Sequence, residues 1–446
     1  MLVSTIGITA IVAVGIVGWR VVRGDGSEDP GRAGDWDQIA LVNRSSGDTT
    51  FLDEDGQLVD QTVGSGRVMD VHVRDERLAL VGPDRIVLNG VDAAEPTIVP
   101  IARNSSVSEV KTIDTFHLVI GDPSGGNVVV LDAATGETID VGATAGQANP
   151  LMFAETMRHS TDGTTFAVAD AANFQTILVR PGVIEPAFFP DQPIAVGTEL
   201  IATSQVVGAE ADVTLYDFER DNKATGTIEI PAGGVMVDDV LTLVSIDGAV
   251  YRLGSGDDEA ERIGVVAVPA GETVSSVRPT FDGQRLVVAG AVFEAVIDLD
   301  GTTVFTTTFT TPVAVDEPAV DWTCLPVGGA SAGSGSAAAG FHSIISLETG
   351  EQLADLTGLS VTRVASDGCT VIGERAGVIE VVGVGGGVTL GSLRTAALGP
   401  DGRTVVQQTT AGATELVSID DEFELGEPID LSEHAALNLT VAFLDS

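Results

Sequence analysis

One short unit recurs along most of this chain: a tight turn with Asp and Gly, followed by a run of apolar residues. The Asp-Gly pair suits a tight turn because Gly accepts a positive φ and the Asp side chain caps the turn. Some copies keep only the Asp and one keeps only the Gly. The turn residues of the eight copies are Asp75, Asp114, Asp162, Gly197, Asp238, Asp282, Asp367 and Asp401.

The spacing of the copies is regular enough to predict a repeat architecture. Successive gaps are 39, 48, 35, 41, 44, 85 and 34 residues, and the gap of 85 leaves room for one degenerate unit. In that unit, residues 328–340 are all Gly, Ala and Ser. A period near 40 residues, with four short strands per unit, is typical of a β-propeller. No segment after residue 30 shows sustained helical spacing of apolar residues, so the body is predicted to be all-β.

A second motif lies between these turns and reads strand, Asp-x-x-Thr-Gly turn, strand. The fullest copy of this motif spans residues 126–139. Residues 343–353 contain a second copy, whose turn is expected to be shortened, and residues 248–253 contain a fragment. We interpret it as the outer hairpin of a blade.

The two ends of the body are predicted to share one blade. The apolar run at 435–443 is followed by Asp445, and the run at 39–42 is the strand expected after such a turn. The C-terminal strand would then complete the first blade and close the ring. This gives ten blade-like units of four strands, and seven to ten blades fit the spacing, because some units can be loops. One ring is the favoured arrangement, and two smaller propellers are the alternative.

The Thr-Gly hairpin motif resembles the repeats of bacterial quinoprotein-like and YVTN-type propellers, and the Asp-Gly element is also similar to WD-type blades. The resemblance covers residues 36–446 as a pattern, and three or four units match it well. This resemblance implies a β-propeller fold. Quinone-cofactor enzymes of this superfamily carry a docking Trp on their blades, whereas neither Trp36 nor Trp322 follows a Thr-Gly turn here. No cofactor is therefore predicted.

The N-terminus predicts attachment to a membrane. Residues 2–18 contain no charged side chain and are followed by Trp19, Arg20 and Arg23. Seventeen apolar residues lie at the short end of the range for one transmembrane helix. We predict an uncleaved anchor over residues 1–23, with a cleavable signal peptide as the alternative. An acidic, flexible tether over 24–34 and a propeller over 35–446 follow.

Two observations bear on which side of the membrane the body lies. Arg20 and Arg23 after the span favour a cytoplasmic body, because basic residues are retained on that side. The two cysteines, Cys324 and Cys369, predict one disulfide and an oxidising, extracytoplasmic compartment. Two separate buried thiols are the alternative. We favour a single-pass protein of the cell membrane with its body on the extracytoplasmic side.

Candidate catalytic and metal-binding residues are scattered. The chain has no P-loop, no G-x-S-x-G and no H-E-x-x-H motif. The Gly-rich run 383–387 is predicted to form a hairpin turn rather than a phosphate loop. Acidic clusters at 53–56 and 257–259 are also read as hairpin turns, with Ca²⁺ binding as the alternative. No metal site is predicted for the five histidines, which are His72, His117, His159, His342 and His434.

Charge narrows the range of partners. The chain has 22 basic and 65 acidic residues, a net charge of −43, which excludes readers of nucleic acid or anionic lipid headgroups. Its composition, rich in Ala, Gly, Val and Asp with Arg in place of Lys, indicates a GC-rich bacterial genome.

The favoured function is a binding scaffold whose partner is another envelope protein or a small ligand. A propeller enzyme is one alternative, either a cofactor-dependent dehydrogenase or a hydrolase or lyase, with its site at the central channel. An envelope sensor that signals through the span is another.

Overall fold

A computed structural model describes most of the chain beyond residue 35. The described residues are 36–64, 66–74, 77–90, 96–103, 105–111, 116–121, 128–141, 157–170, 175–180, 187–279, 284–308, 323–327, 342–366, 368–436 and 438–444. Residues from Ala33 to Ser446 belong to one compact unit. The predicted anchor and tether lie outside the described residues. No helix long and apolar enough to cross a membrane occurs in the part of the chain that the structure describes.

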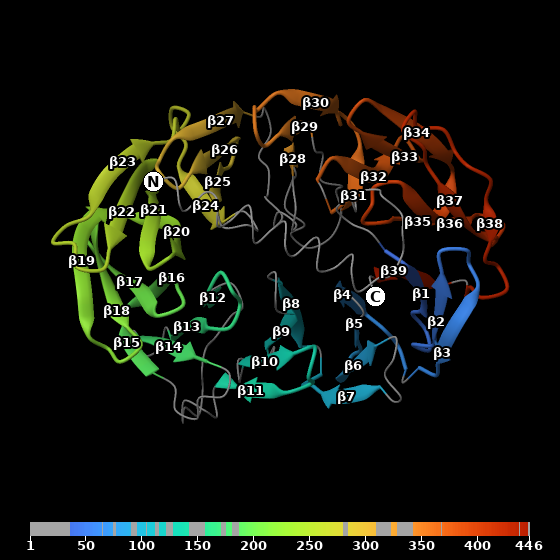
Figure 1. Cartoon of the computed structure of the whole chain (residues 1–446), viewed down its shortest axis with the longest axis horizontal. Coiled ribbons are helices and arrows are strands. Elements are labelled where there is room, and N and C mark those ends of the chain that lie inside the picture. The colour runs from blue at the N-terminus through green and yellow to red at the C-terminus, as the bar shows by residue number, and fades with distance from the viewer. Residues whose placement is uncertain are drawn as a thin grey trace, which may run out of the picture. The chain divides into compact units, whose positions relative to one another are not determined.

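The described strands form ten antiparallel sheets, the blades, which follow one another around a ring (Figure 1). Blade 1 contains β39 (Leu439–Leu444), β1 (Gln38–Asn43), β2 (Thr49–Asp53) and β3 (Leu58–Thr62). Blade 2 contains β4 (Asp70–Arg74), β5 (Arg77–Val81), β6 (Arg85–Gly90) and β7 (Thr97–Pro100). Blade 3 contains β8 (Ser106–Lys111), β9 (Phe116–Gly121), β10 (Val128–Asp132) and β11 (Thr138–Asp140). Blade 4 contains β12 (Met157–His159), β13 (Phe166–Asp170), β14 (Gln175–Val179) and β15 (Ala187–Pro190).

The next three blades follow the same order. Blade 5 contains β16 (Gln192–Val196), β17 (Leu200–Val207), β18 (Glu210–Asp217) and β19 (Asn222–Glu229). Blade 6 contains β20 (Pro231–Val237), β21 (Val240–Ser245), β22 (Ala249–Gly254) and β23 (Glu261–Val265). Blade 7 contains β24 (Val274–Pro279), β25 (Arg285–Gly290), β26 (Phe293–Asp298) and β27 (Thr303–Thr308).

Blades 8, 9 and 10 complete the series. Blade 8 has three described strands, β28 (Cys324–Val327), β29 (Ser343–Ser346) and β30 (Gln352–Asp355). Blade 9 contains β31 (Ser360–Val364), β32 (Thr370–Arg375), β33 (Val378–Gly383) and β34 (Gly386–Gly391). Blade 10 contains β35 (Leu393–Leu398), β36 (Thr404–Thr409), β37 (Thr414–Ser418) and β38 (Ile429–Asp430). The prediction of ten all-β units is confirmed. The expected four strands are found in nine of them, and the chain preceding β28, residues 309–322, lies outside the described residues.

Apolar packing between neighbouring blades holds the ring together. The described residues form ten buried clusters, one at each interface between consecutive blades. For example, Phe51 of blade 1 packs with Leu78 of blade 2, and Leu52 on the opposite face of blade 1 packs with Val406 of blade 10. Alternation of side chains along a strand gives each sheet two apolar faces, one for each neighbour. Ten blades with ten such interfaces make one closed ring, so the two-propeller alternative is wrong.

The chain closes this ring through blade 1, as predicted. Strand β39 pairs antiparallel with β1, from Gln38 opposite Leu444 to Asn43 opposite Leu439. Trp36, just before β1, strengthens the closure through two contacts. Its Nε1 donates a hydrogen bond to Asp401 Oδ2 at 3.0 Å. Its ring packs edge-on against the ring of Phe443, with the two centroids 5.2 Å apart. One residue thus joins the start of the body to the turn of blade 10.

The Asp-Gly turns connect the first and second strands of their blades. Gly163 and Gly402 have φ values of 67° and 68°, which favour Gly. Asp401 Oδ1 accepts hydrogen bonds from the backbone N–H groups of Arg403 and Thr404, both at 3.0 Å. The predicted capping of the turn by the Asp side chain is therefore confirmed at Asp401. Asp75, Asp114, Asp282 and Asp367 lie outside the described residues.

The Thr-Gly turns have a packing role that the sequence alone did not show. Gly136 in blade 3 has φ 77°, and a Cβ there would lie 3.1 Å from Thr97 Cγ2 on the outer strand of blade 2. Gly350 in blade 8 has φ 71°, and a Cβ there would lie 2.5 Å from the Cβ of Phe305 on the outer strand of blade 7. The missing side chain lets one blade's outer hairpin rest against the preceding blade.

Loss of the Trp36 side chain is expected to weaken ring closure. Trp36→Ala should lower the free energy of unfolding by about 2 kcal/mol, because it removes one hydrogen bond and a partly buried aromatic contact. Trp36→Phe retains a ring against Phe443 and should recover most of the loss. Thermal denaturation of the three proteins tests this, and equal midpoints would contradict a role for Trp36 in closure.

Candidate functional site

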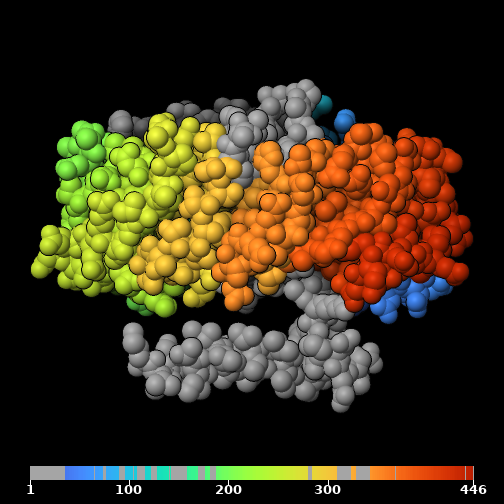
Figure 2. Space-filling model, turned by 90° about the horizontal axis from the view of Figure 1, so that it is seen from above, coloured from blue at the N-terminus to red at the C-terminus, as the bar shows by residue number. Residues whose placement is uncertain are grey.

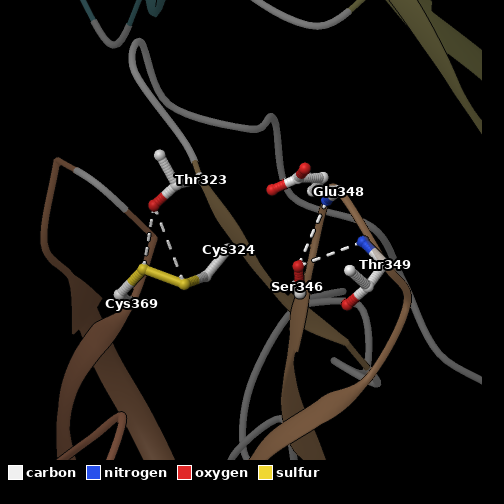
Figure 3. The surroundings of a disulfide bond; sticks show 6 residues. All are labelled: Thr323, Cys324, Ser346, Glu348, Thr349 and Cys369. Carbon is white, nitrogen blue, oxygen red and sulfur yellow. Dashed lines mark hydrogen bonds between the residues drawn. A yellow bond between two sulfur atoms is a disulfide. The ribbon is translucent and has the colours of Figure 1, made fainter.

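The predicted disulfide joins blades 8 and 9 (Figure 3). Cys324 begins β28, Cys369 directly precedes β32, and their Cα atoms are 4.9 Å apart. Cys324 is buried and packs with Ile344 of blade 8 and Val371 of blade 9. Thr323 Oγ1 lies 3.1 Å from Cys369 Sγ. The disulfide prediction is confirmed, and the bond braces the blade with only three described strands.

The turn beside the disulfide corrects one sequence interpretation. We expected the Thr-Gly turn of residues 343–353 to be shortened, but it has full length, with Ser346 in the place that Asp132 occupies in blade 3. The Oγ of Ser346 accepts hydrogen bonds from the N–H groups of Glu348 at 3.2 Å and Thr349 at 3.1 Å (Figure 3). Asp132 Oδ1 similarly accepts from Ala134 N at 2.8 Å. A serine hydroxyl can replace the carboxylate because the turn needs only an acceptor.

An open groove of about 650 Å³ lies between the same two blades. Strand β30 of blade 8 and strands β33 and β34 of blade 9 supply its walls. The Gly-rich run 383–387 forms the hairpin between β33 and β34, as predicted, and lines the groove with backbone rather than side chains. Gly385 in this turn has φ 92°.

Charged side chains of both blades meet in the groove. Arg375 Nη1 lies 2.9 Å from Glu380 Oε2, and Asp355 comes from the opposite blade. Hydrogen bonds from Thr357, together with electrostatic interactions with Arg375 and His342, hold the pKa of Asp355 below its ordinary value. The groove thus offers two carboxylates and one guanidinium, groups that bind polar or cationic ligands through ion pairs and hydrogen bonds.

The five histidines come from different parts of the ring, and among them His117 and His159 are close enough to interact electrostatically. His117 of β9 is buried, with its ring 5.1 Å from that of Phe166. Burial lowers the pKa of His117, and the charge of Asp132 opposite it acts in the other direction. The remaining histidines, in chain order, are His72 on blade 2, His159 on blade 4, His342 on blade 8 and His434 on blade 10. The described residues contain no group of three or more potential metal ligands.

Both acidic clusters lie in hairpin turns. Asp53 Oδ1 accepts hydrogen bonds from Asp55 N at 3.1 Å and Gln57 N at 2.7 Å, between β2 and β3. Asp257 Oδ2 accepts one from Gly254 N at 2.6 Å, between β22 and β23. These carboxylates are engaged in turn capping. Calcium binding at either cluster stays an alternative.

Sequence reasoning missed a buried acid, Glu294 of β26. Its exposed fraction is 3%, and it lies two residues before Val296, on the face of blade 7 that packs against blade 8. Burial raises the pKa of Glu294 to about 8, while the charge of Arg278 acts to lower it. The available signal was Glu294 itself, which interrupts the apolar run from Phe293 to Ile297 in this strand.

Known proteins resemble this chain in fold only. No protein-family model and no curated protein matches it. A eukaryotic initiation factor structure is 10% identical and covers 92% of this chain and 98% of its own, with a TM-score of 0.47. The dihydro-heme d1 dehydrogenase NirN is 12% identical over 91% of this chain and 75% of its own, with a TM-score of 0.40. BamB from Moraxella catarrhalis is 12% identical over 64% and 86%, with a TM-score of 0.34. The propeller fold that the sequence motifs imply is shown by the ten-bladed ring itself.

Removal of the disulfide is expected to destabilise the ring. The double variant Cys324→Ser, Cys369→Ser should lose about 4 kcal/mol of unfolding free energy, because the bond closes a loop with a sequence separation of 45 residues. Thermal unfolding with and without a reductant measures the effect, and the double variant should not respond to reductant. Identical midpoints for the native protein under both conditions would contradict a stabilising bond.

Glu294 is expected to make stability depend on pH. Its folded-state pKa lies above the ordinary value, so between about pH 4.3 and 8 the unfolded chain releases a proton that the folded chain retains. The free energy of unfolding should therefore fall by about 1.4 kcal/mol per pH unit as pH rises through this window.

The variant Glu294→Gln should lose this slope and exceed the native protein in stability at pH 8, with little difference near pH 5. Denaturant unfolding at several pH values measures it. Glu261→Gln, the same change at an exposed position, is the control. A native slope that persists in Glu294→Gln would assign it to another group.

Proposed function

We propose that this protein is a membrane-tethered, extracytoplasmic β-propeller that serves as a binding scaffold. The observation that carries the proposal is the closed ring of ten apolar interfaces, which holds many loops and hairpins on rigid strands. Such a frame suits recognition, because loops can vary while the strands keep their positions. The groove between blades 8 and 9 is one place where polar groups of a partner or ligand would bind.

Two features support the proposed location. A disulfide persists in oxidising compartments and is rare in the cytoplasm of ordinary bacteria. The uncharged residues 2–18 have the composition of a membrane anchor. Together they favour a body held outside the cytoplasmic membrane, where another envelope protein or a small ligand is the expected partner.

Cross-linking in native membranes tests the proposal. Full-length tagged protein should fractionate with membranes and yield one reproducible partner in fixed proportion to the chain. A variant lacking residues 2–19 should leave the membrane fraction as a folded monomer, because only the anchor has been removed. Absence of any reproducible partner from full-length protein would contradict the scaffold function, and membrane association without residues 2–19 would contradict the anchor.

A further inference from the structure

The outer edge of blade 1 is unusually exposed. Strand β3 is the outermost strand of its sheet and pairs only with β2 among the described strands. Its residues from Leu58 to Gln61 are all exposed, including Leu58 at 54% and Val59 at 47%. A free strand edge presents unpaired backbone donors and acceptors, and large apolar side chains on it favour pairing with another strand.

Blade 10 extends this exposed region. A Cβ on Gly56, in the turn before β3, would lie 2.7 Å from Leu431 Cδ2 and 3.0 Å from Ile429 Cγ2. The blade 1 hairpin is therefore in contact with the outer strand of blade 10, and Figure 1 shows the two outer edges side by side. Ile429 at 37% and Leu425 at 44% are also exposed. We call Leu58, Val59, Leu425 and Ile429 the rim patch.

The surroundings of the rim patch are strongly acidic. No Lys or Arg occurs between residues 404 and 438, and Arg44 is the only basic residue between 36 and 64. Arg44 donates to the carbonyl of Met69, and Arg403 pairs with Asp421. The exposed acids of the two hairpins and their neighbours are Glu54, Asp55, Asp60, Asp420, Asp421, Glu422, Glu424, Glu427, Asp430 and Glu433. The field at this rim favours a cationic partner.

We propose that the rim patch binds an extended, Lys- or Arg-rich segment of a partner protein, which adds to blade 1 as a fifth strand beside β3. Backbone hydrogen bonds to the free edge from Asp60 to Thr62 would supply affinity. The register of β3 shifts at Val59, and apolar side chains at the end of the added strand would contact the exposed side chains of Leu58 and Val59 there. The acidic surroundings select basic residues at the positions between them. This inference rests on the proposed scaffold function and names the chemistry of its partner.

A synthetic peptide of about nine residues with alternating Lys and Val is a direct probe, because it can form such a strand. Fluorescence anisotropy should show binding to the native protein that weakens with salt. The variant Leu58→Lys, Val59→Lys should bind about tenfold more weakly or worse, because like charges oppose each other across paired strands. Val265→Lys, at a position of 53% exposure on the outer strand of blade 6, should bind like the native protein.

A second peptide separates strand addition from simple attraction to acid. The same peptide with a central Pro keeps its charge but lacks a backbone donor and cannot continue a strand, so it should bind much more weakly. Equal binding of the two peptides, unchanged binding to the Leu58→Lys, Val59→Lys variant, or no binding at all would overturn the inference. Both variants change exposed side chains, and their thermal midpoints verify that the ring is intact.

Failure of this inference can be told apart from failure of the proposed function. If the membrane partner is captured equally well by native protein and by the Leu58→Lys, Val59→Lys variant, the scaffold function stands and the rim patch is not its docking site. If the native protein captures no partner, the scaffold function itself fails. Capture that is lost only in the rim variant, together with the peptide results, supports both.

Discussion

The antiparallel pairing of β1 with β39 is the constraint on which the rest of the structure depends. Every blade has two apolar faces and each face needs a neighbour, so an open ring would expose two of them to water. Pairing the two ends of the body within one sheet leaves no such face unpaired (Figure 2 shows the blades in continuous succession along one side). Trp36 and Asp401 extend this closure beyond the sheet.

The disulfide lies where the repeat pattern of the sequence is weakest. Blade 8 has only three described strands and follows the widest gap between repeat turns. The disulfide ties its first described strand, β28, to blade 9, where Cys324 and Val371 share a cluster. The charged groove lies between the same two blades.

Local chemistry explains why much of this fold could be predicted. Turns such as that of Asp401 are specified by neighbours two or three residues away, and the closing strand follows from counting units. The disulfide was predictable because only Cys324 and Cys369 were available. Glu294 was not predicted, because its environment comes from blade 8 rather than from its own strand. The sequence predicts that Gly350 is a turn residue. Its close approach to Phe305 could not be predicted, because it depends on the packing of blade 8 against blade 7.

The sequence by itself determined the class of fold, its period and its closure, since turn residues and alternating apolar strands act within one unit or between neighbouring strands. Only the tertiary structure decided that ten units form one ring, that Asp355 and Arg375 of neighbouring blades line one groove, and that β3 stays exposed beside β38. These features depend on the distance and tilt between blades. Those are set by the summed packing of ten interfaces, which no single repeat encodes.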